Sequence, residues 1–362
     1  MDAALYDVEG GFYQRGGAAG RRRDFVTSPE LGSLFAAVWA RTLDEWWDEL
    51  GQPDPYVVVE AGAGSGTLAR QLLAARPACG PALRYVLVER SARLRDEQNG
   101  RLPLELPAFV LGPSSPDSKN EEDESPRHVP GRGPMVTSLA ELPALSFSGV
   151  VFANELLDNL PFDLLEWRDS GWHEVRVGSA GDDSDELIEV IVPAPAEVAA
   201  EAERFVSDTP IVGGRIPLQR QASDWLRRAR ALLECGRVVV VDYADTTAAL
   251  ARAPWTSWLR TFRRHQPGLA PLDRPGSQDI TCVVATDQLA AIHQPTAAST
   301  QAAWLSLHGM DELVAVARAA WHERAAIGDL EALRVRSLIA EAKALTDLQG
   351  LGAFQVLEWV SE

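Results

Sequence analysis

The chain has 362 residues and a net charge of −18, because 52 acidic side chains outnumber 34 basic ones. This acid excess argues against broad nucleic-acid binding, since a protein that neutralises phosphates needs surplus cations. With 46% hydrophobic residues and 11 Trp, the chain has the apolar material for a large core. Its length suggests two domains, or one large domain with an insertion.

Cysteine spacing and targeting signals narrow the class of protein further. Cys79, Cys235 and Cys282 are far apart and odd in number, which does not indicate a disulfide framework. No CxxC or HExxH spacing occurs, so we expect no metal site. The first residues lack the apolar core of a secretory signal, and no apolar run is long enough to span a membrane. These features favour a cytoplasmic protein without a membrane partner.

Residues 1–50 are expected to form an N-terminal helical cap. The triplet at 28–30 has the pattern of a helix start, with Ser28 as a capping hydroxyl, then a proline and an acid in the first turn. Apolar residues recur at helical spacing over 31–46, which predicts one helix continuing from this start.

Residues 51–160 are expected to form the first half of an α/β core. The apolar run at 56–59 predicts a buried strand, and a glycine turn, a helical pattern and a second apolar run follow it. This order predicts a βαβ unit, and therefore a parallel sheet with a right-handed crossover. Residues 112–134 are rich in Pro, Ser, Gly and acids, which is typical of a mobile surface insertion.

The rest of the chain predicts an accessory region and the second half of the core. Within 161–230, the segments GWHEVRVG and DELIEVIVPA alternate as an antiparallel hairpin does, and ASDWLRRARALLECG predicts a helix that Gly236 ends. Within 231–362, RVVVVD, ITCVVA and FQVLEWV predict strands, with Ala-rich helices between them. The whole pattern predicts a Rossmann-like α/β fold with a mostly parallel sheet.

Four predicted strands end in an acid: Glu60, Glu89, Glu155 and Asp242. Ligands of open parallel sheets bind beyond the carboxyl ends of the strands. We therefore expect these four acids to give one pocket a negative potential.

The glycine turn suggests the ligand of that pocket. Gly62, Gly64 and Gly66 permit a tight turn and a close approach of ligand to backbone, but Thr67 stands where a dinucleotide fingerprint needs its third glycine. Glu60 beside the turn suits a ligand with an ammonium and a sulfonium better than a diphosphate. That ligand is S-adenosylmethionine.

Glu89 lies 23 residues after Gly66, at the end of the second strand. An acid there accepts hydrogen bonds from ribose hydroxyls. This spacing also fits NAD, so it indicates a ribose ligand without choosing between the two. A glycine-rich turn without a ligand is the third interpretation.

Asn154, Glu155 and Asp158 follow the strand SGVVFAN and are expected to form a wall of the methyl-transfer site. Glu155 could hold a guanidinium through charge-assisted hydrogen bonds. The two acids could instead begin a helix and stabilise its dipole. Asp242 and Tyr243 leave the same choice open, between facing a substrate and serving as a cap and a core residue.

Several segments together resemble the MidA-type family of class I S-adenosylmethionine-dependent methyltransferases. They occur in family order: GFYQR, DFVTSPELGSLFA, VEAGAGSGTLARQLL, VERSARLRDEQ, FANELLDNLPF, VVVVDYAD and PGSQDIT. Mitochondrial members of that family act in respiratory complex I assembly as protein arginine methyltransferases. The resemblance implies a seven-stranded core with an added helical and hairpin region. It also implies that the TSPE turn at 27–30 and the NELLD segment lie near cofactor and substrate.

The sequence therefore predicts an S-adenosylmethionine-dependent methyltransferase that acts on a protein side chain, with arginine as the expected acceptor. Glu155 is expected to orient the acceptor, with Asp158 as a second catalytic candidate. The expected cofactor-binding residues are Glu60, Gly62, Gly64, Gly66, Glu89, Asn154, Thr27 and Pro29. A small-molecule methyltransferase and a cofactor-binding assembly protein with little turnover are the alternatives, and a homodimer is a further option.

Overall fold

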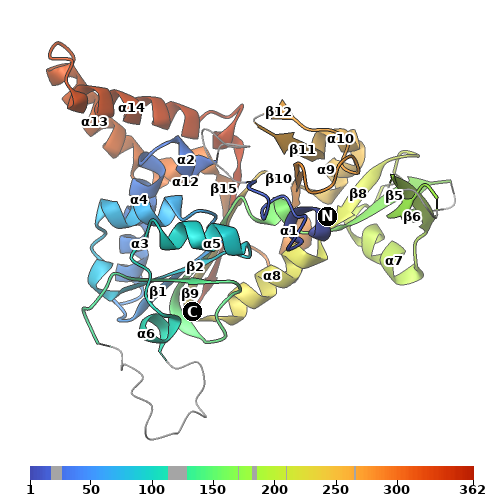
Figure 1. Ribbon diagram of the computed structural model, residues 1–362, viewed down its shortest axis with the longest axis horizontal. Coiled ribbons are helices and arrows are strands. Elements are labelled where there is room, and N and C mark those ends of the chain that lie inside the picture. The colour runs from blue at the N-terminus through green and yellow to red at the C-terminus, as the bar shows by residue number, and fades with distance from the viewer. Residues whose placement is uncertain (18–26, 113–128, 170, 182–185, 209, 265) are drawn as a thin grey trace, which may run out of the picture.

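A seven-stranded sheet forms the centre of the protein (Figure 1), with the strand order β15-β16-β9-β4-β1-β2-β3. The computed structural model describes residues 1–17, 27–112, 129–169, 171–181, 186–208, 210–264 and 266–362. Most of the acidic insertion expected at 112–134 lies outside these ranges.

Five neighbouring strands of this sheet are parallel. The two strands nearest the C-terminus, β15 and β16, complete the sheet at one edge. The parallel strands are β1 (Tyr56–Ala61), β2 (Leu83–Val88), β3 (Met135–Leu139), β4 (Phe147–Asn154) and β9 (Leu233–Asp242). The last strand, β16 (Gln355–Ser361), is antiparallel to β9 and to β15 (Ala297–Thr300). This order confirms the predicted α/β fold of the class I methyltransferase type.

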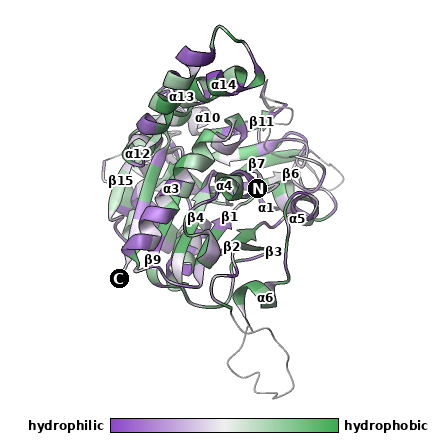
Figure 2. Cartoon of the chain, turned by 90° about the vertical axis from the view of Figure 1, so that its left-hand side faces the viewer, coloured by the Kyte–Doolittle hydropathy of each residue, from purple (hydrophilic) through white to green (hydrophobic). Residues whose placement is uncertain are grey.

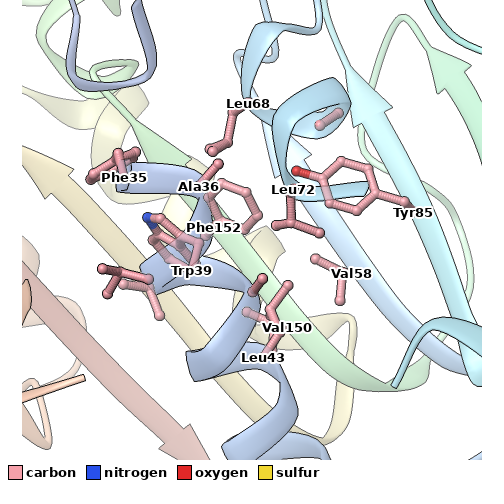
Figure 3. Packing of buried hydrophobic residues seen from close by; sticks show 14 of the residues in the cluster. Phe35, Ala36, Trp39, Leu43, Val58, Leu68, Leu72, Tyr85, Val150 and Phe152 are labelled. Carbon is pink, nitrogen blue, oxygen red and sulfur yellow. The ribbon is translucent and has the colours of Figure 1, made fainter. Parts of the chain in front are cut away.

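Helices cover both faces of the sheet because alternate residues of each central strand point to opposite sides. On one face, Tyr56 and Val58 pack with α3 (Leu34–Glu49) and α4 (Thr67–Ala75). Trp39 of α3 stacks on Phe152 of β4 with 4.5 Å between ring centroids (Figure 3). On the other face, Val57 and Val59 lie in a cluster with α8 (Arg220–Ala231) and α11 (Thr286–Ile292).

The helix predicted from Ser28 onward is broken into two. A four-residue helix α2 (Ser28–Leu31) precedes α3, with Gly32 between them. A Cβ at Gly32 would lie 2.0 Å from Glu341 Cδ, and the same carboxylate accepts a hydrogen bond from the Leu34 amide. The expected cap by Ser28 is also wrong, because its hydroxyl donates to Gln301 Oε1 over 2.9 Å.

The helix α8 ends at Ala231, and the prediction that it continues to Gly236 is wrong. Strand β9 begins at Leu233, which pairs with Phe147 of β4. Gly236 is needed inside the strand, since a Cβ there would lie 1.8 Å from the carbonyl oxygen of Gly149. The glycine therefore permits close strand pairing and does not end the helix.

A four-stranded antiparallel sheet is inserted between β4 and β9 and lies at the right in Figure 1. Its order is β7-β6-β5-β8, so the predicted hairpin is confirmed as β6 and β7. It packs with α7 through Leu165, Trp172 and Ile216. The element bounds are β5 (Asp163–Arg168), β6 (Gly171–Ser179), β7 (Leu187–Pro193), α7 (Ala196–Phe205) and β8 (Arg215–Leu218). The limits of 161–230 for this region stay a prediction.

Short elements around the central sheet complete the fold. The predicted strand ITCVVA forms β13 and β14, which lie in two small sheets beside the central one. The elements are α1 (Asp2–Tyr6), α5 (Ala92–Asn99), α6 (Pro107–Leu111), η1 (Gly80–Ala82), η2 (Leu157–Asn159), β10 (Ala244–Asp245), α9 (Thr247–Arg252), α10 (Trp255–Trp258), β11 (Leu259–Arg263), β12 (Gln266–Pro267), β13 (Asp279–Cys282), β14 (Val284–Ala285) and η3 (Leu351–Ala353).

Three C-terminal helices precede the closing strand: α12 (Gln301–Leu307), α13 (Met310–Arg324) and α14 (Leu330–Leu345). The pair α13 and α14 projects from the body at the upper left of Figure 1. Hydrophobic and hydrophilic residues are mixed along both (Figure 2). Within the described ranges, none of the helices combines the length and apolarity needed to cross a bilayer.

Candidate cofactor and acceptor sites

The glycine turn joins β1 to α4 with three backbones in the left-handed region. Gly62, Gly64 and Gly66 have φ of +73°, +54° and +77°, which side chains with a Cβ rarely adopt. A Cβ at Gly66, the N-cap of α4, would lie 2.9 Å from Leu102 Cδ1, whereas nothing lies within 4 Å of a Cβ built at Gly64. Gly66 is therefore fixed by packing, and Gly64 borders open space.

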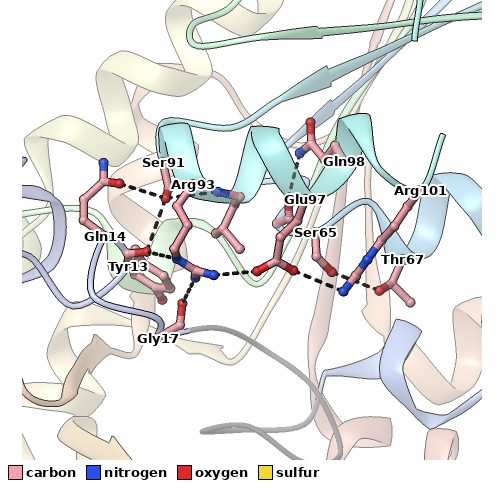
Figure 4. Close-up of polar contacts among 12 residues, drawn as sticks. Tyr13, Gln14, Gly17, Ser65, Thr67, Ser91, Arg93, Glu97, Gln98 and Arg101 are labelled. Atoms are coloured by element: carbon pink, nitrogen blue, oxygen red, sulfur yellow. Dashed lines mark hydrogen bonds and ion pairs between the residues drawn. The ribbon is translucent and has the colours of Figure 1, made fainter. Parts of the chain in front are cut away.

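Two buried side chains, Glu89 and Gln98, form hydrogen bonds with the backbone of this turn. The Gly64 amide donates to Glu89 Oε2 over 3.0 Å, and the other oxygen of Glu89 accepts from the Ser91 amide. Gln98 donates from Nε2 to the Gly64 carbonyl over 2.7 Å (Figure 4), and its Oε1 accepts from Ser138 Oγ. Sequence reasoning found Glu89 by its place after a strand, but Gln98 stands inside α5 with no such signal.

A cavity of about 400 Å³ opens beside the turn, at the carboxyl ends of β1, β2 and β4. Gly66 lies just outside its wall, at the start of α4. The other residues expected to bind cofactor all line this cavity: Glu60, Gly62, Gly64, Glu89, Asn154, Thr27 and Pro29. Its size lies within the range of small-molecule pockets, about 300 to 1,000 Å³.

Three of the four strand-end acids, Glu60, Glu89 and Glu155, line the cofactor cavity. Glu60 is 5% exposed and accepts a hydrogen bond from the Tyr85 hydroxyl over 2.6 Å. Burial raises the pKa of Glu60 to about 8 and that of Glu155 to about 8, and it also raises the pKa of Glu89. A bound cation would favour the ionised form of these groups.

Glu155 stands where two cavities meet. Its φ of +53° is unusual for a residue with a side chain. Its Oε1 accepts hydrogen bonds from Asn154 Nδ2 and the Ser28 amide, both over 3.2 Å. The Oδ1 atom of Asn154 is buried and has no partner among the described residues. The strained backbone thus turns Glu155 to the boundary between the cavities, both of which it lines.

The second cavity has a volume of about 780 Å³ and lies on the far side of Glu155. Its walls come from the chain after β9, from α9, α10, β11 and β13, and from the segment before β16. Asp158 lines this cavity and not the first one. The Tyr243 hydroxyl donates to Asp158 Oδ2, and burial raises the pKa of Asp158 to about 6.

Asp242 does not line either cavity, so the expectation that it shapes the pocket is wrong. Its Oδ2 accepts hydrogen bonds from the amides of Leu157 and Asp158, and its Oδ1 accepts from the Tyr243 amide. Asp242 therefore acts as a backbone cap, which was one of the two interpretations. Tyr243 lines the second cavity, and its substrate-facing role stays a prediction.

The N-terminal segment reaches the cofactor cavity through Tyr6 and Tyr13. The Tyr13 hydroxyl lies 3.0 Å from Asn159 Oδ1 and 3.1 Å from Asp279 Oδ1. Arg93 of α5 donates to the Tyr13 carbonyl over 3.1 Å (Figure 4). Sequence reasoning did not select Tyr13 as a site residue, and its only signal was its place in the GFYQR segment of the resemblance.

No group of three or more His, Cys, Asp or Glu side chains in the described part of the chain could hold a metal ion.

The fold and the cofactor cavity together define a class I methyltransferase architecture. A family model described as an S-adenosyl-L-methionine-dependent methyltransferase matches residues 38–303. The chain belongs to this family, which confirms the resemblance seen in the sequence.

Two solved structures resemble the whole chain. One is a protein from Burkholderia thailandensis, described as a superfamily member and methyl transferase and bound to S-adenosyl-homocysteine, with a TM-score of 0.77 and 28% identity. The match covers 100% of this chain and 86% of that one. A native crystal structure of a protein of the same superfamily and organism matches with a TM-score of 0.75 and 27% identity, over the same shares of the two chains.

Curated relatives carry the name protein arginine methyltransferase NDUFAF7, mitochondrial. The Xenopus tropicalis protein is 30% identical over 291 residues, which cover 78% of this chain and 64% of that protein. The Drosophila melanogaster homolog is 27% identical over 311 residues, which cover 78% of this chain and 63% of the relative. The chain thus spans somewhat less than two thirds of the length of these relatives.

Proposed function

We propose that the protein transfers a methyl group from S-adenosylmethionine to an arginine side chain of a partner protein. The observation that carries the proposal is the position of Glu155, which lines both the cofactor cavity and the larger cavity beside it. One carboxylate can therefore contact groups that enter from either side. The names of the relatives support arginine as the acceptor.

The residues of the first cavity fit the cofactor. Gly64 leaves open the space that a Cβ would fill, and Asn154 offers a buried oxygen with no partner among the described residues. Glu60 and Glu155 suit an ammonium and a positive sulfur, and Glu89 suits the hydroxyls of a ribose. When bound, S-adenosylmethionine supplies an electrophilic methyl group on its sulfonium centre.

The chain's own contribution is alignment and charge. Glu155 can hold the acceptor nitrogen at the boundary, and its carboxylate can take the proton that this nitrogen loses when its bond to the methyl carbon forms. A pKa of about 8 for Glu155 suits that exchange near neutral pH. Methyl transfer of this kind needs mainly correct placement of the reacting atoms, so a catalytic triad is not required.

The second cavity could also enclose a small molecule, because about 780 Å³ exceeds the space that one side chain needs. A small-molecule acceptor is therefore the second candidate. A cofactor-binding assembly protein with little turnover is the third, and an absence of methyl transfer in the labelling experiment below would favour it. A cytoplasmic location, a homodimer and the absence of nucleic-acid partners remain predictions from the sequence, and the relatives are named as mitochondrial proteins.

The test is methyl labelling of a host lysate with S-adenosylmethionine that carries a labelled methyl group. We expect label in the protein fraction, recovered as methylarginine after hydrolysis, and a loss of more than tenfold in Glu155→Gln. Glu323→Gln on the exposed face of α13 is the matched control and should label like the wild type. Label only in the small-molecule fraction would overturn the protein acceptor, and full activity of Glu155→Gln would remove Glu155 from the reaction.

A further inference from the structure

One edge of the inserted sheet is uncovered in the part of the chain that the structure describes. At the other edge, β8 is buried and packs beside α9, whereas β7 pairs only with β6. Ile188 and Val190 of β7 are 38% and 39% exposed, and Val177 of β6 is 58% exposed. An exposed apolar edge strand is a template for pairing with another chain.

The register of β7 on β6 determines which backbone groups of β7 are already used. The Ala194 amide donates to the Trp172 carbonyl over 3.1 Å, and the Ala180 amide donates to the Glu186 carbonyl over 2.9 Å. Hydrogen-bonded pairs recur at every second residue of an antiparallel ladder. In this register, the even-numbered residues of β7 therefore bond to β6.

The odd-numbered residues of β7 direct their backbone away from β6. The N–H and C=O groups of Leu187, Glu189 and Ile191 have no hydrogen-bond partner within the described ranges. Pro193 ends this open stretch, because proline has no N–H to donate. Strand β7 can thus accept one more antiparallel strand over residues 187–191.

The two faces of β7 differ, and this difference sets the side chains of an added strand. Successive side chains point to opposite faces, so Ile188, Val190 and Val192 share an apolar face. On the other face, Glu189 pairs with Arg215 and keeps 37% of its side chain exposed. Because side chains directly opposite each other interact across strands, a segment that alternates apolar with basic residues matches both faces.

The charge of the inserted region favours a basic partner. Residues 161–218 contain thirteen acidic residues, four arginines and no lysine. This short region thus carries half of the net charge of −18. Two copies of the chain that paired through β7 would bring two such regions together, and their repulsion opposes self-association. A segment rich in Lys or Arg is attracted instead.

The inserted sheet packs against a wall of the second cavity. Ala251 of α9 lies in one apolar cluster with Leu165 of β5 and Ile216 of β8. Ala249 and Leu250 of the same helix line the second cavity. A partner segment bound to the sheet would therefore be tethered beside this cavity, which raises the local concentration of the rest of the partner.

We propose that β7 binds an extended segment of a partner protein as an added β-strand, and that basic and apolar side chains alternate along this segment. The main chain of the segment bonds to the open backbone groups of β7, and its side chains provide the selectivity. The inference goes beyond the proposed function, because no residue of β7 lines either cavity and the pairing needs no cofactor.

Fluorescence anisotropy on the full chain without cofactor tests the proposal. The probe is a labelled octapeptide in which lysine alternates with valine. One comparison peptide replaces each lysine by glutamate, and the other places all lysines before all valines. We expect saturable binding of the probe and at least tenfold weaker binding of both comparison peptides. Hydrogen exchange at residues 187–191 should slow when the probe is bound, because the new strand covers the open amides.

Two variants separate the edge from general attraction by charge. Ile191→Pro removes an outward N–H and no hydrogen bond to β6, and Val190→Lys places a charge on the apolar face. Each should weaken probe binding at least tenfold. Val316→Lys, at a position of α13 that is 71% exposed, is the matched control and should bind like the wild type. Val190→Lys keeps all backbone hydrogen bonds, so it decides the case if Ile191→Pro does not fold.

Three outcomes contradict the proposal: no binding of the probe by the wild type, equal affinity for the three peptides, or unchanged affinity in Val190→Lys. A dimer of the free chain that Val190→Lys dissociates would assign the edge to a second copy and overturn the basic partner. Probe binding without methylarginine in the labelled lysate would overturn the proposed function and leave this site. Methylarginine formation without probe binding would remove the site alone.

Discussion

The Gly64 amide donates a hydrogen bond to Glu89 Oε2 over 3.0 Å, so the acid that follows β2 holds the turn that follows β1. The same carboxylate accepts the Ser91 amide at the start of α5. Glu89 therefore joins two strand ends and a helix start before any ligand arrives. A ribose hydroxyl would meet an acceptor whose position is already fixed, which lowers the entropy lost on binding.

Gly64→Val should weaken the binding of S-adenosylmethionine by more than tenfold. The backbone there has a φ of +54°, and a side chain would extend into the cofactor cavity. Gly51→Val is the matched control, since Gly51 also has a positive φ and open space around it but lies at the end of α3. Titration calorimetry should show near-normal affinity for the control, and equal losses in both would attribute the effect to backbone strain.

Gln98→Leu should weaken cofactor binding although Gln98 does not line the cavity. The substitution leaves the Gly64 carbonyl and the Ser138 hydroxyl without their partner, so the turn loses its support. We expect about a tenfold rise in Kd by calorimetry, equivalent to about 1.4 kcal/mol. Gln294→Leu, at an exposed position, is the control. An unchanged Kd in Gln98→Leu would show that the turn holds its shape alone.

Glu60→Gln should flatten the pH dependence of stability. An unfolded Glu titrates near pH 4.3, and burial raises the pKa of Glu60 to about 8. The protonated form thus stabilises the folded state fully below about pH 4, and this stabilisation is lost as pH rises to about 8, at about 1.4 kcal/mol per pH unit.

Urea unfolding from pH 5 to pH 8 measures this effect. The free energy of unfolding should fall less steeply in Glu60→Gln than in the wild type, because the amide keeps an oxygen for the Tyr85 hydroxyl and does not ionise. Glu323→Gln should follow the wild-type slope. Parallel curves for Glu60→Gln and the wild type would mean that Glu60 titrates as it does in the unfolded chain.

Tyr13→Phe should lower the free energy of unfolding by about 1 to 3 kcal/mol, because it leaves buried acceptors on Asn159 and Asp279 without this donor. Tyr6→Phe is the paired comparison. The two rings stack at 5.5 Å, but the Tyr6 hydroxyl lies 3.5 Å from its acceptor, the Asn159 carbonyl. We expect a change below about 0.5 kcal/mol for Tyr6→Phe, measured by chemical denaturation. Equal effects of the two changes would contradict the assigned role of Tyr13.

The predictions from sequence succeeded where the pattern is local. The apolar run at 56–59, the three glycines and the acid at 89 lie close together along the chain, and they predicted β1, the turn and the position of Glu89. Parallel strands then placed Glu155 at the same edge of the sheet. These features need no knowledge of distant residues.

The predictions failed where a distant partner decides. Ser28 does not cap its helix because Gln301, 273 residues away, accepts its hydroxyl. Asp242 turns to the backbone at Leu157 and not into the pocket, a contact across 85 residues. Tyr13 reaches Asn159 across 146 residues. A single sequence without its fold contains no local signal for such pairs.

The contact of Asp242 with the amides of Leu157 and Asp158 joins the carboxyl end of β9 to the chain just before the accessory sheet. The point where the chain leaves the core for the inserted region is thus held by a carboxylate that lies outside that region. Strands β5 to β8 can therefore be exchanged for another module without moving Glu155. In this architecture, the surface that meets a partner can then change without a change in the residues that serve methyl transfer.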